Sequence, residues 1–407
     1  MKRTALFLVL ALIFLEWLDF SLYLYLAKSV FAVQFFPDSS ASVILSFALF
    51  ATAYFARPVG GWLFGVRADS KGRRVPMIVS AALMGVATLG LCLLPAYAQI
   101  GVAATWGLLG LRIAQGLALG GEINTSAMFL VESNPQRPLF TGSLVAMSCA
   151  LGMFIGGSFA TLLSYFSLMD GWRFVFAAAG LLSLWVCRLR KQLGESAEFI
   201  AAETAKSTPV NWLAHRRGMV NIFTLGIYVS VTVYLCNIFW VSYATDCQLW
   251  SRTSCIAIGS LAQLLSALLA VLIGRRAHAV DVYRLLQASM LVLIVTAPLL
   301  FYATTQLNTP AVLVSLLGYI AGNGLLSAAL FYFLYLQLPV TLRCRGVSTI
   351  WAIAASLGAS TLPLSAHLVS RGAVWFPGAL VSILAATSLL FCREMRSSRR
   401  GNELIYS

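Results

Sequence analysis

Long apolar runs separated by short polar stretches dominate this chain. A helix that crosses a bilayer needs roughly 20 consecutive, mostly apolar residues. Twelve runs of about that length occur, at residues 5–27, 42–66, 76–97, 101–131, 139–164, 172–187, 219–244, 254–274, 283–305, 311–336, 346–370 and 373–392. The pattern therefore predicts an all-α integral membrane protein with twelve transmembrane helices.

The composition supports this prediction. Hydrophobic residues make up 60% of the 407 positions and charged residues only 10%, whereas a soluble globular protein has about 25% charged residues. A chain with so few charges could not cover a surface that faces water. We therefore exclude a soluble enzyme or binding domain and expect the lipid bilayer to be the chain's main surroundings.

The net charge of +14 predicts an orientation in the membrane. With twelve spans, both termini lie on one side, and 22 of the 28 lysines and arginines fall on that side. The excess of positive charge on cytoplasmic loops then places both termini in the cytoplasm of a bacterial inner membrane. No nucleic-acid partner is expected. The first apolar run follows Lys2 and Arg3 as in a signal peptide, but it contains Glu16 and Asp19 and is too long for one.

The longest polar stretch divides the chain into two similar halves. We expect an N-terminal six-helix bundle at 1–187, a cytoplasmic connector at 188–217, and a C-terminal six-helix bundle with a short tail at 218–407. Pro135 and Pro339 are 204 positions apart, as are Gly142 and Gly346. Both pairs fall in equivalent loops, which indicates a duplicated architecture.

Ionisable residues within the spans are the candidates for proton coupling, because charge is costly at bilayer depth. Glu16 and Asp19 are three residues apart on one face of the first span, and Tyr23 continues that face. A carboxyl group in a medium of low dielectric binds a proton more readily than in water. Together with Glu122 in the fourth span, these two carboxylates can load and release a proton.

Arg112, also in the fourth span, is the candidate anchor for a substrate. A guanidinium group can hold a carboxylate through two hydrogen bonds, from Asp19, from Glu122 or from a substrate. The alternative is a static ion pair with a purely structural role. The other candidate substrate contacts are polar or aromatic side chains that could cradle a quaternary amine or form interhelical hydrogen bonds. They are Trp17, Tyr23, Asn237 and Trp240.

A charged loop after the second span has ordered spacing and a fixed place in the topology. It reads Gly65-Val-Arg-Ala-Asp69-Ser70-Lys71-Gly72-Arg73-Arg74. Its glycines permit close packing and a tight turn. Asp69 can cap a neighbouring helix or pair with the cations around it. The ordered spacing makes Gly65, Asp69, Gly72, Arg73 and Arg74 the candidate functional residues of this loop.

This loop resembles the signature of the major facilitator superfamily, and further motifs between residues 14 and 199 are similar to its metabolite:proton symporter branch. That branch includes carriers like those for proline/betaine, 2-oxoglutarate, citrate and shikimate. The motifs are Glu16-Trp17-Leu18-Asp19-Phe20, Arg57-Pro58-Val59-Gly60-Gly61, Arg112-Ile-Ala-Gln115-Gly116, Gly120-Gly121-Glu122, Gly171-Trp172-Arg173 and Glu195-Ser196.

The resemblance implies two six-helix bundles that work by alternating access, and symport of a small carboxylate or zwitterionic metabolite with protons. It implies that Asp69, together with Gly65, Gly72, Arg73 and Arg74, belongs to a gate at the cytoplasmic side. It also implies that Glu16, Asp19, Arg112 and Glu122 line a central cavity. Two departures concern the gate, since Ser70 replaces the usual arginine and the second copy of the loop is reduced to Gly274-Arg275-Arg276.

Two other functions remain as alternatives: an exporter or uniporter of the same fold, and a membrane receptor that transports nothing. An enzyme is not expected, because the sequence contains no nucleophile–base set and no nucleotide-binding loop. We expect no cofactor and no metal, because the histidines are scattered. The expected partners are a small-molecule substrate and protons, and a monomer is expected. Cys247 and Cys255 flank one external loop and are open to either a disulfide or free thiols.

Overall fold

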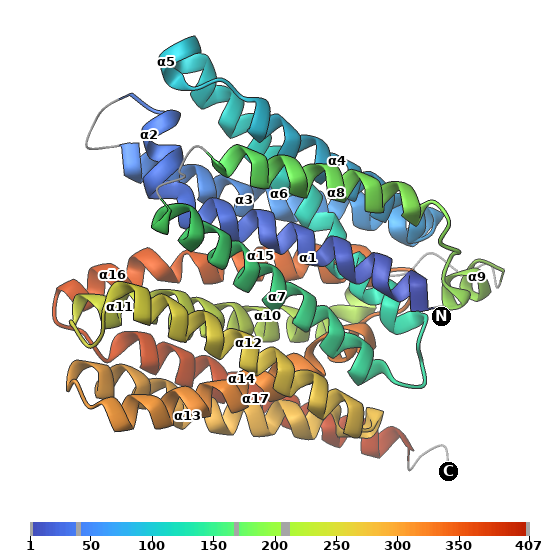
Figure 1. The fold of residues 1–407 in the computed structure, drawn as a ribbon. Coiled ribbons are helices and arrows are strands. Elements are labelled where there is room, and N and C mark those ends of the chain that lie inside the picture. Colours follow the sequence, from blue (N-terminus) through green and yellow to red (C-terminus); the bar gives the residue numbers. More distant parts are fainter. Residues whose placement is uncertain (1–2, 38–41, 167–170, 205–211, 404–407) are drawn as a thin grey trace. The chain divides into compact units, whose positions relative to one another are not determined.

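The computed structural model describes residues 3–37, 42–166, 171–204 and 212–403, with the side chains of 28, 42–51, 164, 204 and 392–403 left aside. Within these ranges the chain forms helices and no strands. The long elements of the first half are α1 (Arg3–Leu26), α3 (Ser42–Lys71), α4 (Arg74–Leu93), α6 (Val102–Glu132), α7 (Pro138–Tyr165) and α8 (Trp172–Arg190). Those of the second half are α10 (Arg216–Val233), α12 (Arg252–Arg276), α13 (Val282–Thr305), α14 (Thr309–Gln337), α15 (Arg343–Ala359) and α17 (Phe376–Glu403) (Figure 1).

Each predicted span corresponds to a helix or to a nearly continuous set of helices. Ten described stretches are long and apolar enough to cross a bilayer. Helix α3 and the apolar part of α17, Phe376–Phe391, coincide with the second and twelfth predicted spans. The seventh span continues from α10 through the π-helix η4 (Tyr234–Phe239) into α11 (Trp240–Asp246). The predicted all-α membrane architecture is therefore confirmed.

Large apolar side chains are exposed along many of these helices, as a lipid-facing surface requires. Trp106, Phe174 and Trp185 are among them, each with at least 60% of its surface accessible. Such an extent of exposed apolar surface would cause aggregation in water. In a bilayer the same side chains contact acyl chains of similar polarity.

The chain packs as two compact units. Unit 1 comprises Met1–Asn134, Ser148–Trp212 and Leu338–Ile353, and unit 2 comprises Pro135–Met147, Leu213–Gln337 and Ala354–Ser407. Each unit thus includes a short segment from the opposite half of the sequence. These two segments begin 203 positions apart, close to the 204-residue offset of the sequence repeat, as expected for a duplicated fold.

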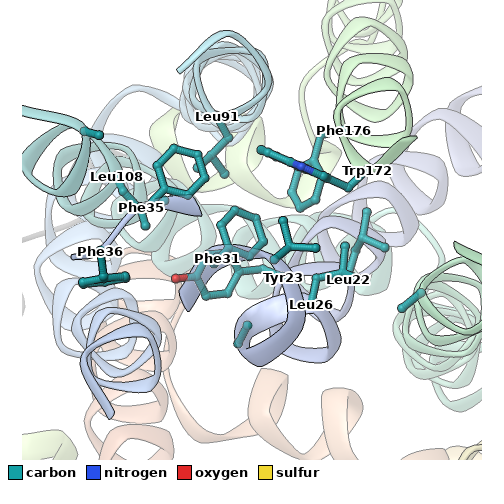
Figure 2. Close-up of a cluster of buried hydrophobic side chains, with 14 residues drawn as sticks. Leu22, Tyr23, Leu26, Phe31, Phe35, Phe36, Leu91, Leu108, Trp172 and Phe176 are labelled. Atoms are coloured by element: carbon teal, nitrogen blue, oxygen red, sulfur yellow. The ribbon is translucent and has the colours of Figure 1, made fainter. Parts of the chain in front are cut away.

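Within unit 1, α6 packs against α3 and α4, and α8 packs against α4 and α1. At one end of these helices a cluster of aromatic and aliphatic side chains is fully buried (Figure 2). The ring centroids of Phe31 and Tyr23 lie 4.2 Å apart, and Trp172 meets Phe31 edge to face at 5.1 Å. Arg173 donates hydrogen bonds to the carbonyl oxygens of Cys92 and Leu94, at the end of α4. The Gly-Trp-Arg motif therefore fixes the start of α8 to its neighbours.

Unit 2 has a separate packing core, in which α14 packs against α12 and α13, and α13 packs against α17. The two cysteines for which a disulfide was considered lie on either side of the turn between α11 and α12, Cys247 directly after α11 and Cys255 in the first turn of α12. Cys247 and Cys255 are both free thiols. The free-thiol alternative is therefore the one found, and hydrogen bonds of the helix ends hold this loop in place.

Candidate transport and gating sites

One hydrogen-bond network in unit 1 joins the predicted proton carrier to the predicted substrate anchor. Nη1 of Arg112 donates to the side-chain oxygen of Gln115 at 2.6 Å. The amide nitrogen of Gln115 donates to Oδ2 of Asp19 at 2.6 Å. The hydroxyl of Thr88 donates to the same Oδ2 at 3.2 Å. All four side chains are buried, so α1, α4 and α6 together position one carboxylate and one guanidinium within a single network.

Aromatic rings surround the guanidinium groups of this region. The Cζ atom of Arg112 lies 3.9 Å from the ring centroid of Tyr23, and that of Arg57 lies 3.9 Å from the centroid of Tyr54. The ring of Phe20 lies within 6 Å of both cations. Cation–π contacts of this kind stabilise a charge that has lost its water. Phe20 and Tyr54 were not predicted, although Phe20 belongs to the first-span motif.

Glu16 lies one turn before Asp19 and has different surroundings. Its side chain is 1% exposed, and within the described residues its two carboxylate oxygens have no hydrogen-bond partner. Glu16 interacts electrostatically with the charged groups of Glu122, Arg190, Arg57 and Asp19. A buried carboxylate without donors is costly. The two first-span carboxylates therefore share a helix face but differ in environment.

Glu122 forms a direct ion pair with Arg190 in the last turn of α8. The hydroxyls of Ser80 and Ser126 also donate to its carboxylate, at 2.7 and 2.8 Å. We predicted Arg190 in the solvated connector and did not predict this pair. The structure instead buries Arg190 completely. The only sequence signal is a membrane carboxylate that needs a cation, because a single loop arginine gives no hint of where its side chain points.

The remaining predicted substrate contacts lie in both units. In unit 2, the amide of Asn237 donates to the carbonyl of Gly259 at 2.8 Å, and the indole of Trp240 donates to Thr304 at 3.0 Å. Both donors thus stabilise contacts between helices of that unit. In unit 1, Trp17 is half-buried beside Phe20 at 5.7 Å.

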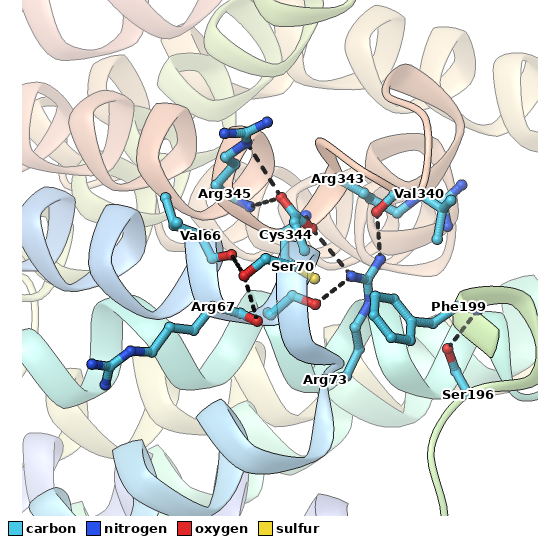
Figure 3. Close-up of polar contacts among 12 residues, drawn as sticks. Val66, Arg67, Ser70, Arg73, Ser196, Phe199, Val340, Arg343, Cys344 and Arg345 are labelled. Carbon is cyan, nitrogen blue, oxygen red and sulfur yellow. Dashed lines mark hydrogen bonds and ion pairs between the residues drawn. The ribbon is translucent and has the colours of Figure 1, made fainter. Parts of the chain in front are cut away.

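The charged segment predicted as a loop is helical up to Lys71, as the last turns of α3, and only Gly72 and Arg73 form the turn before α4. This segment forms a second polar cluster of unit 1, at the first turn of α15 (Figure 3). The carboxylate of Asp69 accepts hydrogen bonds from the backbone N–H groups of Cys344 and Arg345, at 2.9 and 3.0 Å. A carboxylate is favoured there by the unpaired N–H groups and the dipole of the helix. Burial raises the pKa of Asp69, which lies beyond the predicted end of its span, and the neighbouring Arg73 opposes that shift.

Arg73 pairs with both Asp69 and Glu132, and Arg343 extends this cluster from Glu132 to Glu198. Its guanidinium lies 3.2 Å from Asp69 and 3.0 Å from Glu132. Arg343 contacts the same Glu132 at 2.8 Å and Glu198 at 2.9 Å. The Arg73 side chain is fully buried. The segments around residues 69–73, 132, 198 and 343–345 are therefore tied together by charge-assisted hydrogen bonds, which are among the strongest in proteins.

The other three predicted gating residues have distinct positions. A Cβ atom on Gly65 would overlap the backbone of Arg345, so glycine allows α3 to approach α15 closely. Gly72 has a φ of +94°, which favours glycine at the turn between α3 and α4. The backbone N–H of Arg74 donates to Glu195 at 3.1 Å, and its side chain donates to the carbonyl of Lys191. Arg74 thus points toward the end of α8 rather than toward Asp69.

The second copy of this loop, Gly274-Arg275-Arg276, shares with the first copy the close approach of two helices at its glycine. A Cβ on Gly274 would meet Ser143 and the backbone at Leu139, in the first turns of α7. This close approach within unit 2 corresponds to that of Gly65 and α15 in unit 1. The acidic partner is different, since Asp281 pairs with the exposed Arg284 at 3.4 Å. The ionic cluster of the first copy has no counterpart among the described residues of the second.

In the part of the chain that the structure describes, no three histidine, cysteine, aspartate or glutamate side chains gather as metal ligands would. Within each site, most of the polar groups instead pair with one another, Glu16 being an exception. The chemistry that this arrangement supports is reversible protonation and the binding of anions, because its groups are carboxylates, guanidiniums and amides.

Comparison with known proteins identifies the family. The family described as "Sugar (and other) transporter" matches residues 5–218, more than half of the chain. The inner membrane metabolite transport protein YhjE of Escherichia coli (strain K12) is 30% identical over 94% of this chain and 92% of its own length. The alpha-ketoglutarate permease of that strain is 28% identical over 94% of this chain and 92% of its own length. Its shikimate transporter is 32% identical, but that match spans only 62% of this chain and 61% of the relative.

Solved structures agree on the fold. The proton:xylose symporter XylE bound to 6-bromo-6-deoxy-D-glucose matches with a TM-score of 0.73 at 18% identity, over 97% of this chain and 96% of the other. FucP in the outward conformation matches with a TM-score of 0.69 at 13% identity, over 95% and 97%. The resemblance predicted from the motifs is thereby confirmed. The chain is a multi-pass membrane transporter, not an enzyme, and it belongs to the sugar (and other) transporter family of the major facilitator superfamily.

Proposed function

We propose that this protein is a secondary active transporter that couples the entry of protons to uptake of a small carboxylate or zwitterionic metabolite. Alternating access between the two six-helix bundles would move the substrate. The single observation that supports this most strongly is the buried Asp19–Gln115–Arg112 network. It joins a group that can bind a proton to a group that can bind an anion.

The first-span carboxylates are the proposed proton-binding pair. Asp19 accepts two hydrogen bonds, an environment that suits its ionised form. Glu16 lacks such donors among the described residues, an environment that suits a neutral carboxylic acid. The two carboxylates, one turn apart on the helix, would share one proton. The pair would take up this proton on one side of the membrane and release it on the other. We assign Glu122 a supporting role, because its carboxylate is engaged by Arg190.

The proposed substrate class follows from Arg112. A substrate carboxylate that binds this guanidinium would exchange its hydration shell for a buried, bidentate contact. The names of relatives point the same way, since they include a shikimate transporter, an alpha-ketoglutarate permease and putative proline/betaine transporters. For a zwitterion, Trp17 and Tyr23 would supply aromatic faces to the positive end.

We further propose that the Asp69–Arg73–Glu132–Arg343 cluster is the gate on the cytoplasmic side, and that it must open once in each transport cycle. The excess of positive charge on the loops supports an orientation with both termini in the cytoplasm of a bacterial inner membrane. A monomer is the proposed functional unit.

Uptake into proteoliposomes with an imposed inward proton gradient tests this function. Labelled 2-oxoglutarate, shikimate, proline and betaine are offered to the wild type and to Asp19→Asn, with Asp281→Asn as the matched control outside the predicted spans. We expect gradient-driven accumulation of one of these compounds, its loss in Asp19→Asn and its retention in the control. Flux that is independent of the proton gradient and is retained in Asp19→Asn would refute coupling to protons and indicate a uniporter. Absence of all flux by the wild type would leave an exporter or a receptor.

A further inference from the structure

The side chain of Gln115 is the direct link between Asp19 and Arg112. It is 2% exposed. Its oxygen accepts from Arg112 at 2.6 Å, and its nitrogen donates to Asp19 at 2.6 Å and contacts the hydroxyl of Thr88 at 3.1 Å. One amide therefore contacts the proposed anion anchor at one end and the proposed proton carrier at the other.

Chemistry fixes the orientation of this amide. A guanidinium has only donors, so the Gln115 atom that meets Arg112 must be the oxygen. The NH₂ group then necessarily faces Asp19, where it requires an acceptor. Asp19 can supply an acceptor at Oδ2 whether the carboxyl group is ionised or neutral, provided that any proton is on the other oxygen.

The two oxygens of Asp19 are consequently not equivalent. Oδ2 accepts from both Gln115 and Thr88, whereas Oδ1 has no hydrogen-bond partner within the described part of the chain. A proton on Oδ2 would break one of the two existing hydrogen bonds. A proton on Oδ1 would leave both in place, so Oδ1 is the site that the network leaves for protonation.

We propose that Gln115 is the positioning residue that couples substrate binding at Arg112 to protonation of Asp19, and that it directs the proton to Oδ1. This inference rests on the proposed function. A cation at the amide oxygen polarises the amide and strengthens donation by its NH₂ group. Arg112 thus stabilises ionised Asp19 through Gln115, although Gln115 itself has no charge.

Substrate binding would reverse this effect. A carboxylate bound to Arg112 neutralises the guanidinium and weakens the donation from Gln115 to Asp19, which then takes up a proton more easily. By linkage, protonated Asp19 favours the bound substrate to the same degree. The two ligands of a symporter would in this way promote each other's binding without touching.

Other charged groups around the first span belong to the same electrostatic system. Glu16 is on the same helix face as Asp19, and α3 contributes Arg57. From α6 and α8 the ion pair of Glu122 and Arg190 also acts on Glu16. Arg112 also acts directly on Asp19 through its charge. An uncharged substitution at Gln115 leaves this charge and the others in place, so the change it causes in the titration of Asp19 reports on the lost hydrogen bond.

An infrared titration tests the link without any substrate. The C=O band of a protonated carboxyl group is followed against pH in the purified full-length protein, and the band of Asp19 is identified by its absence in Asp19→Asn. Gln115→Leu removes one hydrogen bond from the ionised carboxylate. The pH at which the band is half lost should then rise by about one to two units. Gln306→Leu, at an exposed position after α13, is the matched control and should leave the band unchanged.

Transport gives the second readout. In the wild type, the KM for labelled 2-oxoglutarate or shikimate should fall roughly tenfold as the external pH is lowered through the titration of Asp19, a typical coupling between two sites. In Gln115→Leu this dependence should shrink to about twofold or less. Gln115→Met, which is similar in size, adds no charge and has no donor for Asp19, serves as a second variant if the leucine variant does not fold.

The outcomes separate the two proposals. An unshifted Asp19 band in both Gln115 variants, together with a KM that keeps its full pH dependence, would overturn the role of Gln115 even if the protein is a symporter. A wild type that shows no proton-driven uptake of any compound would refute the proposed function. A shifted band would in that case still establish that Gln115 controls protonation of Asp19.

Discussion

Replacement of Asp69 by asparagine should open the proposed cytoplasmic gate. In the structure the Asp69 carboxylate accepts two backbone hydrogen bonds at the start of α15 and one from Arg73. Asparagine is the same size but retains only one acceptor oxygen. Its NH₂ group would face an N–H group or a guanidinium, which also have only donors.

The magnitude follows from the hydrogen bonds that are lost. A hydrogen bond to a charged group contributes about 1.5–3 kcal/mol, and at least one of the three has no acceptor in the variant. Because about 1.4 kcal/mol corresponds to a factor of ten in an equilibrium constant, the open population should rise roughly 10- to 100-fold. The dipole of α15, worth up to about 2 kcal/mol in partly buried geometries, acts in the same direction.

The gate contains its own reporter. Cys344, whose backbone N–H binds Asp69, has a completely buried thiol in the closed cluster. In a background where the other seven cysteines are replaced by serine, a membrane-impermeant maleimide is added to inside-out vesicles. When opening and closing are fast relative to alkylation, the labelling rate follows the open population. The rate at Cys344 should therefore rise roughly 10- to 100-fold in Asp69→Asn.

The matched control is Ser70→Ala at the next residue. Ser70 is exposed, and its hydroxyl bonds only to carbonyl oxygens of its own helix, at Val66 and Arg67. Its replacement should leave the labelling rate within about twofold, as expected for surface substitutions. If Asp69→Asn labels at the rate of the wild type while remaining folded, the reasoning that this carboxylate holds the gate closed is wrong.

Three further predictions concern stability. Arg190→Leu should destabilise the protein by about 3–5 kcal/mol, because it leaves Glu122 buried without its cation. The double variant with Glu122→Gln should regain most of the melting temperature in detergent, and a larger loss in the double variant would contradict this. Trp172→Ala should cost about 3–5 kcal/mol by creating a cavity in the aromatic cluster, and thermal unfolding that matches the wild type would exclude that packing role. Since Cys247 and Cys255 are free thiols, a reductant should leave both the melting temperature and the mobility in non-reducing gels unchanged, and a shift in either would show a disulfide.

The sequence was sufficient for the fold because membrane helices are local structures. Each satisfies its own backbone hydrogen bonds, so its position depends on about 20 consecutive apolar residues. The twelve spans coincide with the helices of the structure for this reason. The candidate carboxylates were also visible, since charge at bilayer depth is rare and costly. The loop motif identified Asp69 and Arg73 from the spacing of glycine, acid and base.

The pairing of these residues was decided by the tertiary structure alone. Nothing in the spacing of Glu122 and Arg190 indicates that they meet, because 68 residues separate them. The same holds for Asp69 and the first turn of α15, 275 positions later. Local sequence determines where helices form and which side chains lie at membrane depth. Which of those charges neutralise each other depends on how the helices pack, and that depends on interactions between residues far apart in the chain.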